Sequence, residues 1–392
     1  MDASELVELL SADGLNLLDS LPPFDSKADI VNTVARLRAD GHSPGLVAAA
    51  LTQSRLRARA EAKFGPFASR MLFTEAGLEQ ATRLSVASLH AGRFHSAGVT
   101  RVADLGCGIG ADAMALAGLD HSVLAVEADE VTAAIAAYNL APWPDATVVH
   151  ADATTVDLDD VDGVYLDPAR RNERGRLRDP ADWSPSLDFA FGLAERMPTG
   201  VKLGPGIDRG LIPPDAEAQW VSVDREVVEL GVWFGVLARP GIRRSALVIT
   251  ANGAAELSAE SDSEDADVTP LGQYLYEPDG AVIRARLIGD LARRLGAGML
   301  DRSIAYLTAD ASADSPFASR FRVVESFPLD VKRLKRELTA RNIGTIEIKK
   351  RGVDIDPAQF RKQLALKGEA SATLILTRAG GRRIAVLAER ES

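Results

Sequence analysis

The sequence from residue 102 to residue 112 reads Val102-Ala103-Asp104-Leu105-Gly106-Cys107-Gly108-Ile109-Gly110-Ala111-Asp112. A short apolar run with strand character ends in three alternating glycines, and an alanine-rich helical pattern follows. Glycine lets the backbone approach a ligand because no Cβ stands in the way. A helix N-terminus adds free N–H groups and positive dipole potential. The stretch therefore predicts a strand, a ligand-binding turn and a helix.

The glycines alone leave two ligand classes open. Gly106-x-Gly108-x-x-Ala111 also satisfies the dinucleotide pattern G-x-G-x-x-G/A. Asp104 stands two residues before the first glycine, at the expected strand end. A carboxylate there would repel a pyrophosphate, but it suits the ammonium group that S-adenosylmethionine carries and NAD lacks.

Two further carboxylates follow the next strand patterns. Glu127 ends one and is placed to accept hydrogen bonds from ribose hydroxyls; Asp152 follows another and is placed to bond the adenine amino group. Either residue alone is compatible with an exposed loop. Acidic residues at successive strand ends instead indicate a site, because doubly wound sheets bind ligands at that edge. The expected cofactor-binding set is Asp104, Gly106, Gly108, Gly110, Glu127 and Asp152.

The surrounding sequence predicts an α/β protein. Residues 1–95 show apolar spacings of three and four and no strand pattern, so we expect helices over 4–18, 30–51, 55–64 and 78–90. From residue 100, β-rich runs alternate with helical ones, which is typical of a parallel sheet with helices on both faces. The expected strands are 102–105, 122–126, 147–149, 163–166, 201–203, 220–223 and 246–250, and the expected helices are 111–117, 130–139 and 187–196.

The C-terminal part predicts an α+β module. We expect helices over 281–295, 330–341 and 357–366, and strands over 322–326, 345–348, 372–377 and 383–388. Residues 252–267 are rich in Ala, Ser, Asp and Glu without periodicity, which favours an exposed acidic loop or linker. The expected domains are a helical region (1–95), an α/β domain that binds the cofactor (96–251), an acidic linker (252–268), a small ferredoxin-like α+β segment (269–321) and a basic domain (322–392).

Composition sets outer bounds on function. The chain has 392 residues, of which 46% are hydrophobic and 26% charged, typical of a globular protein. No apolar run reaches 18 residues and the N-terminus lacks a secretory pattern, so we expect a cytoplasmic protein with no membrane contact. Cys107 is the one cysteine, which excludes an internal disulfide, and the five histidines show no ligand spacing, so no metal is expected.

Charge is distributed unevenly. Residues 322–392 hold 16 Lys and Arg against 9 Asp and Glu, a net charge of +7, which leaves −18 for the remainder of a chain whose total is −11. A basic binding module appended to an acidic enzyme would give this asymmetry.

The fourth strand pattern ends in Asp167-Pro168-Ala169-Arg170-Arg171. With the glycine loop before it, this motif resembles class I S-adenosylmethionine-dependent methyltransferases, over about residues 65–250. Within them the chain resembles a bacterial group with a C-terminal THUMP-like domain. That likeness rests on Phe73-Thr74 with Leu78-Glu79-Gln80, on the motif at 167–171, on Tyr274-Leu275-Tyr276-Glu277-Pro278 and on the basic tail. The implied fold is a Rossmann-like sheet with a helical N-terminal region and a C-terminal α+β module.

The resemblance implies an RNA substrate and names Asp167, Pro168 and Arg170 as catalytic candidates. Ala169 and Arg170 depart from the amino-methylating pattern, which has a second proline and an aromatic residue that stacks on a flipped base. A covalent mechanism through cysteine is not expected, because Cys107 lies inside the cofactor loop. We therefore expect direct methyl transfer to nitrogen or oxygen, with Asp167 orienting or deprotonating the acceptor.

Other side chains are candidates for contact with the substrate. Arg171 could bind phosphate and Trp183 could stack on a base, although a solvated loop and a ring that pins a loop to the core are the plainer interpretations. In the tail, basic runs on neighbouring elements favour an anionic partner. The candidates there are Lys332, Lys335, Arg336, Lys349 and Lys350.

Three alternatives remain open on the sequence. An NAD-dependent oxidoreductase would use the same glycine pattern. An RNA-binding protein with an inactive methyltransferase domain would explain the imperfect fourth motif. A small-molecule methyltransferase would leave the basic tail a role in assembly.

Overall fold

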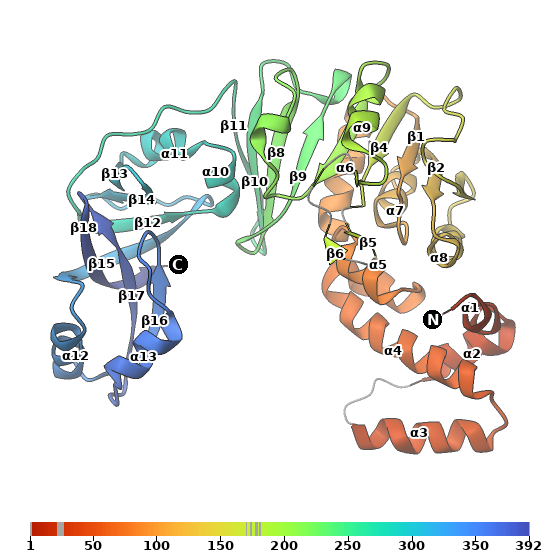
Figure 1. The fold of residues 1–392 in the computed structure, drawn as a ribbon, viewed down its shortest axis with the longest axis horizontal. Helices are drawn as coiled ribbons and strands as arrows, with labels where there is room; N and C mark the ends of the chain where they lie inside the picture. Colours follow the sequence, from red (N-terminus) through yellow and green to blue (C-terminus); the bar gives the residue numbers. More distant parts are fainter. Residues whose placement is uncertain are drawn as a thin grey trace. The chain divides into compact units, whose positions relative to one another are not determined.

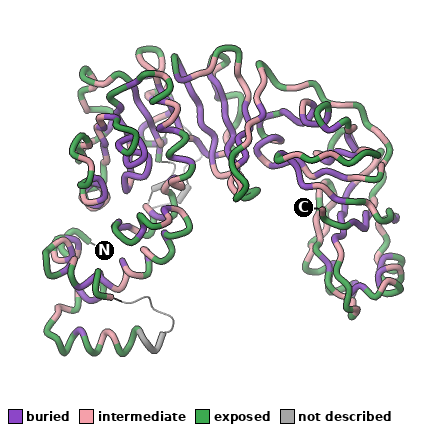
Figure 2. The backbone as a smooth tube through the Cα atoms, turned by 180° about the vertical axis from the view of Figure 1, so that it is seen from behind, coloured by how far each residue is buried: buried purple, intermediate pink, exposed green. Residues whose placement is uncertain are grey.

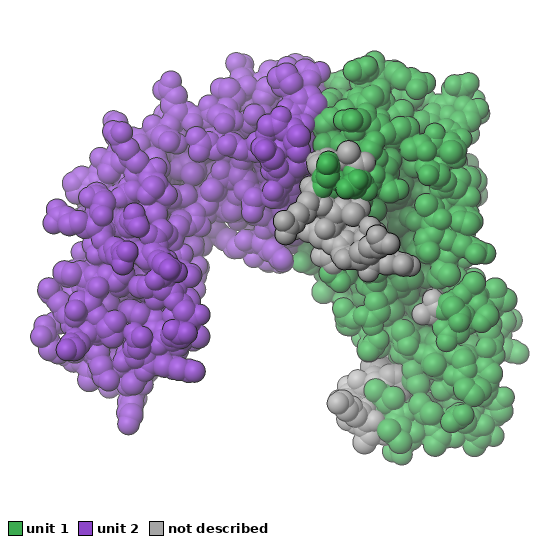
Figure 3. Space-filling view, viewed as in Figure 1, with its two compact units in different colours: residues 1–202, 233–237 green, residues 203–232, 238–392 purple. Residues whose placement is uncertain are grey.

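The computed structural model describes residues 2–21, 27–169, 171–172, 175–176, 179 and 182–391. The chain forms two compact units (Figure 3). Residues 1–202 with 233–237 make the first unit, and residues 203–232 with 238–392 make the second.

The N-terminal region is helical in its described part, as predicted. Ser11 and Ser43 each accept a hydrogen bond from the N–H three residues on, and these caps begin new helices inside stretches that the sequence predicted as continuous. The long helix from Pro44 runs on to Phe64, so the predicted break before residue 55 is wrong. The elements are α1 (Ala3–Leu9), α2 (Ala12–Ser20), α3 (Lys27–Ala39), α4 (Pro44–Phe64), η1 (Gly65–Arg70), α5 (Glu75–Gln80) and α6 (Leu84–Ser96).

The first unit contains a parallel sheet with helices packed along it (Figure 1). Its neighbouring strands run in the order β7-β4-β1-β2-β3, and every printed pair among them is parallel. The strands and helices are β1 (Arg101–Leu105), α7 (Ala111–Ala117), β2 (Ser122–Glu127), α8 (Glu130–Leu140), β3 (Ala146–His150), β4 (Gly163–Leu166), α9 (Leu187–Ala194) and β7 (Thr199–Leu203), with the short strands β5 (Arg171–Asn172) and β6 (Gly175–Arg176) between β4 and α9.

The strand order reverses at β1. The chain proceeds from β1 outward to β2 and β3, and then returns to place β4 on the other side of β1. In open α/β sheets the ligand crevice lies at such a switch point, beside the carboxyl ends of the strands. The loops after β1 and β4 are therefore the first place to look for a site.

The second unit begins with strands that the sequence predicted only in part. β8 (Glu217–Val223) and β10 (Arg244–Thr250) match predicted strands, whereas β9 (Glu226–Trp233) and β11 (Gly253–Ala259) were not expected. β11 pairs antiparallel with the whole of β10, so the expectation of irregular structure is wrong for residues 253–259. The short 3₁₀ helix η3 (Arg209–Leu211) precedes β8 in the chain, and η4 (Gly235–Leu237) lies between β9 and β10 in the chain.

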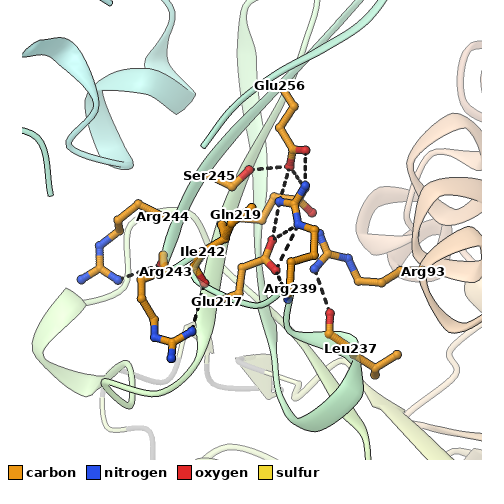
Figure 4. A network of polar contacts seen from close by, with 10 residues as sticks. All are labelled: Arg93, Glu217, Gln219, Leu237, Arg239, Ile242, Arg243, Arg244, Ser245 and Glu256. Carbon is orange, nitrogen blue, oxygen red and sulfur yellow. Dashed lines mark hydrogen bonds and ion pairs between the residues drawn. The ribbon is translucent and has the colours of Figure 1, made fainter. Parts of the chain in front are cut away.

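A buried ion network stabilises these strands (Figure 4). Glu217 is fully buried, and its carboxylate accepts hydrogen bonds from the Arg239 guanidinium and backbone N–H. Arg239 also binds Glu256, which in turn accepts from Gln219 and Ser245. Since every partner is used within the network, we assign it a structural role.

The C-terminal part forms a seven-stranded sheet in the order β13-β14-β12-β15-β18-β17-β16. β15 pairs with β12 on one side and β18 on the other, so one sheet spans residues on both sides of position 322. The predicted helix over 281–295 is two helices, with Arg286 between them at a φ of 60°. The elements are β12 (Tyr274–Pro278), α10 (Gly280–Arg284), α11 (Ile288–Leu295), β13 (Gly298–Asp301), β14 (Ile304–Ala309), β15 (Ala318–Pro328), α12 (Val331–Ala340), β16 (Ile343–Lys350), α13 (Pro357–Leu364), β17 (Ala370–Ala379) and β18 (Arg382–Glu391).

Amphipathic helices complete this module. Leu334 and Leu338 of α12 pack with Phe360 and Leu364 of α13 on an apolar core that includes Phe327. Figure 2 shows the buried backbone concentrated along the strands, with exposed segments in the loops and on the helices. The core thus fixes one face of α12 and leaves its charged face in solvent.

Candidate active site

All three glycines of the loop after β1 have a left-handed backbone, which a side chain would disfavour. The φ angles of Gly106, Gly108 and Gly110 are 83°, 56° and 87°. A Cβ on Gly106 would lie 3.2 Å from the carbonyl oxygen of Asp167, so the β1 loop and the β4 loop approach each other here. The N–H groups of Gly106 and Cys107 bond to the carbonyl of Val126, which fixes the loop to β2. Gly110 then opens helix α7.

Asp104 lies at the end of β1 and is buried, with 1% of its surface exposed. Its Oδ2 atom has no hydrogen-bond partner among the described residues. Burial raises the pKa of this carboxyl well above its ordinary value, and the neighbouring carboxylates of Asp112 and Asp167 raise it further. A cationic ligand group beside the glycine loop could supply the hydrogen-bond partner that this buried carboxyl oxygen lacks.

The other two acidic candidates also lie beyond strand ends, each with local partners. Glu127 ends β2 and accepts hydrogen bonds from the N–H groups of Gly108 and Asp129, at 3.0 and 2.9 Å. It thereby links the glycine loop to the second strand. Asp152 follows β3 and accepts from the N–H and hydroxyl of Thr154, which hold the pKa of Asp152 below its ordinary value. Both carboxylates remain partly or fully accessible to solvent.

Asp167, directly after β4, is one end of a chain of polar contacts. Its carboxylate binds the ammonium of Lys202 on β7, at 2.5 Å between Oδ2 and Nζ. Lys202 also donates to the hydroxyl of Thr82, at 2.9 Å, and Thr82 lies 2.6 Å from Asp112 Oδ2. The other oxygen of Asp112 lies 2.8 Å from His90 Nδ1.

The far end of this chain is enclosed by aromatic rings. His90 Nδ1 lies 2.9 Å from the hydroxyl of Tyr165, and the His90 ring packs against Tyr165 and Trp233. Burial alone would raise the pKa of Asp112, but the hydrogen bond and charge of His90, together with Lys202 and Thr82, lower it. Asp112 is therefore held as a carboxylate, and the cluster carries charge in a buried setting.

Four residues of this chain of contacts were not predicted from the sequence as site residues: Lys202, Thr82, Asp112 and His90. One local signal was available: Lys202 is a charged residue between Val201 and Leu203 in an apolar strand pattern. A lysine is rarely buried without a partner. Thr82 and His90 carry no such signal, because Thr82 lies in the segment between α5 and α6, His90 lies on α6, and both are distant in sequence from Lys202.

The remaining active-site candidates are placed differently. Pro168 is buried behind Asp167. Arg170 and the side chain of Arg171 lie outside the described residues. Trp183 is buried, with 9% of its surface exposed, so its ring is not presented to solvent for base stacking. The plainer interpretation, in which this ring packs a loop into the core, fits its burial.

Cys107 is buried beside the acidic residues of the loop. Burial raises the pKa of its thiol well above the ordinary value, and the carboxylates of Asp104 and Glu127 add to that shift. A thiol that stays protonated is a weak nucleophile. This environment agrees with a mechanism that forms no covalent bond to cysteine.

The basic candidates of the tail fall into two groups. Lys332, Lys335 and Arg336 are exposed on α12, and Lys350 is exposed at the end of β16. Lys349 instead forms an ion pair with Glu277, at 2.6 Å, and lies over the Phe321 ring. Because Glu277 neutralises the charge of Lys349, the exposed lysines of α12 are more available than Lys349 to bind an anionic partner.

Among the residues that the structure describes, no helix combines the length and apolar character needed to cross a membrane. Within the same residues, no three or more His, Cys, Asp or Glu side chains gather as metal ligands.

Known proteins resemble this chain in sequence along most of its length. Residues 318–390 match a family model described as THUMP domain-like, and residues 2–60 match a domain of unknown function. The chain is 35% identical, over 355 residues, to proteins of two Mycobacterium tuberculosis strains (H37Rv and CDC 1551) that are named as uncharacterised S-adenosylmethionine-dependent methyltransferases. The alignment covers 88% of this chain and 95% of each relative.

A solved structure shares the fold. It comes from Porphyromonas gingivalis W83, was solved as a candidate methyltransferase, and superposes with a TM-score of 0.74 at 22% identity over 100% of this chain and 99% of its own. Because the relatives that are 35% identical over 88% of this chain are named S-adenosylmethionine-dependent methyltransferases, the cofactor is S-adenosylmethionine rather than NAD, which sets the oxidoreductase alternative aside. The chain belongs to the class I S-adenosylmethionine-dependent methyltransferases, in the group that carries a C-terminal THUMP-like domain.

Proposed function

We propose that this methyltransferase acts on RNA and transfers the methyl group directly to a nitrogen or oxygen atom. The observation that carries the proposal is the position of Asp167. Its side chain is 31% exposed, it follows β4, and its backbone abuts the glycine loop at Gly106. A group at that point can face an incoming acceptor, while the loop faces the cofactor.

The residues around the loop fit the cofactor. The unpaired, buried Oδ2 of Asp104 suits the ammonium of its methionine part. Glu127 and Asp152, beyond the next two strands, would bind the ribose hydroxyls and the adenine amino group, and the backbone of Gly106, Gly108 and Gly110 would line the path between them. When bound, the cofactor supplies a methyl group already activated by a positive sulfur. The protein's remaining task is to orient the acceptor and take its proton.

Two features support RNA as the substrate. Residues 318–390 match the THUMP domain-like model, and the resemblance associates such modules with RNA-modifying enzymes. The exposed face of α12 carries Lys332, Lys335 and Arg336, which would bind phosphates through charge. A small-molecule substrate would not require such a face.

We expect tritium from labelled S-adenosylmethionine to enter total RNA taken from a strain that lacks this protein. The Asp167→Ala variant should transfer label at least about 100-fold more slowly, because the acceptor loses its orienting carboxylate. RNA from the parent strain, which is already methylated, is the control and should take up little label. Equal labelling by both enzymes would remove Asp167 from the mechanism, and label in protein or small molecules alone would contradict RNA as the substrate.

The basic face of α12 gives a binding test. Changing Lys332 and Lys335 to glutamine should weaken RNA binding and reduce the slope of log affinity against log salt by about 1 to 2, since each lysine releases about one counterion. The matched control changes Arg36 and Arg38, which are exposed on α3. Equal salt slopes for the two double variants, measured by fluorescence anisotropy, would argue against α12 as the RNA-binding face.

A further inference from the structure

The ammonium of Lys202 lies among three carboxylates. It contacts Asp167 directly, and its charge acts on both Asp104 and Asp112. The Lys202 side chain is only 12% exposed, whereas that of Asp167 is 31% exposed. A buried lysine is costly unless its partners compensate the charge. Asp167 is the partner that solvent can reach, so the ion pair connects the protein interior to the acceptor side of the site.

Thr82 fixes the direction of the hydrogen bonds. Its hydroxyl has a single proton, and Asp112, as a carboxylate, can only accept. The Thr82 proton therefore goes to Asp112, at 2.6 Å, and its oxygen accepts from Lys202. His90 holds the second oxygen of Asp112. The buried side of the Lys202 ammonium is thus anchored, and its remaining hydrogens point toward other acceptors, of which Asp167 is one.

We propose that Lys202 is a positioning residue, which holds the Asp167 carboxylate so that it accepts a hydrogen bond from an acceptor bearing an N–H or O–H group. The inference rests on the proposed role of Asp167. It narrows the acceptor to an amino or hydroxyl group. A ring nitrogen that presents only a lone pair would meet the lone pairs of the carboxylate and be repelled.

The transfer balances with these groups alone. The acceptor nitrogen or oxygen forms a bond to the methyl carbon while the bond from that carbon to sulfur breaks, and sulfur keeps the electron pair. The acceptor's proton passes to the Asp167 carboxylate. Lys202 exchanges no atoms with the substrate; its ammonium fixes the orientation of the group that does.

A double-mutant cycle tests this role. The variants are Lys202→Met, Asp167→Asn and the combination, with Lys202→Arg as the conservative change. Arg57→Met is the matched control, because Arg57 is a similarly buried cation whose partner, Asp19, lies on α2. Single-turnover tritium transfer is followed in the RNA, protein and small-molecule fractions of a deletion-strain extract. Thermal unfolding of each variant without cofactor is measured alongside.

We expect Lys202→Met to slow transfer by about 10- to 100-fold in the wild-type background and by less than about 2-fold in the Asp167→Asn background, while Lys202→Arg restores part of the rate. Lys202→Met should also lower the unfolding temperature less in the Asp167→Asn background, where residue 167 is uncharged, than in the wild-type background. Arg57→Met should show no such coupling to Asp167→Asn.

The outcomes separate the inference from the proposed substrate. Label in protein or small molecules with the same coupling would contradict RNA and support Lys202. If RNA is labelled and the rate losses of Lys202→Met and Asp167→Asn simply multiply in the double variant, the positioning role is overturned, whereas the proposal of an RNA substrate remains supported. Full transfer by Asp167→Asn would overturn both Asp167 and Lys202 as proposed.

Discussion

The Gly106→Val variant is expected to lose all measurable binding of S-adenosylhomocysteine while the protein stays folded. At a φ of 83°, a side chain strains the backbone by about 1–2 kcal/mol. Its Cβ would also meet the Asp167 carbonyl at 3.2 Å and force the two loops apart. Because these loops hold opposite sides of the proposed transfer site, a small displacement there should reduce binding by more than about 100-fold.

Gly98→Val separates backbone strain from loop contact. Gly98 also has a positive φ, 73°, but an added Cβ there would have no atom within 4 Å. This control should lower the unfolding temperature similarly and keep nearly full affinity in isothermal titration calorimetry. If Gly106→Val bound the ligand within about 3-fold of wild type, the loop would not form the cofactor site.

Asp104→Asn is expected to stabilise the ligand-free protein as pH rises above the unfolded pKa of the carboxyl, and to weaken S-adenosylhomocysteine binding by about 10- to 100-fold. The folded-state pKa of Asp104 lies well above the unfolded value because of burial, with Asp112 and Asp167 adding repulsion. The folded state therefore holds this proton more tightly than the unfolded state. Stability is then lost as pH rises from the unfolded pKa through the folded one, and asparagine removes that loss.

Ligand affinity should have the opposite dependence on pH. Only the ionised carboxylate of Asp104 can pair with the ligand's ammonium, so binding should strengthen as pH rises through the raised pKa of Asp104. Titrations over a series of pH values above the ordinary carboxyl pKa, with unfolding temperatures measured at the same values, would follow both trends. If Asp104→Asn kept wild-type affinity and the same dependence on pH, Asp104 would not contact the ammonium.

The strands that the sequence missed have a common reason. Glu229 interrupts the apolar run of β9, and β11 is built largely of Ala, Ser and Glu, which have weak strand preference. Each strand forms by pairing with neighbours in the sheet, β11 with β10 and β9 with β8 and β7, which a local sequence pattern does not report. The prediction of one continuous helix over 281–295 is wrong because the chain breaks the helix at Arg286. This residue takes a left-handed conformation that a non-glycine residue disfavours, so the sequence gives no sign of the break.

The sequence by itself determined the strand, glycine turn and helix at 101–117 and the acidic residues at the strand ends, because these features depend on neighbours within a few positions. Only the tertiary structure decided which polar groups meet. Lys202 reaches Thr82 across 120 positions of sequence, and His90 reaches Tyr165 across 75. Such contacts form because α6 packs against the sheet that contains β4 and β7, which buries these side chains together, and burying a polar group without a hydrogen-bond partner is costly.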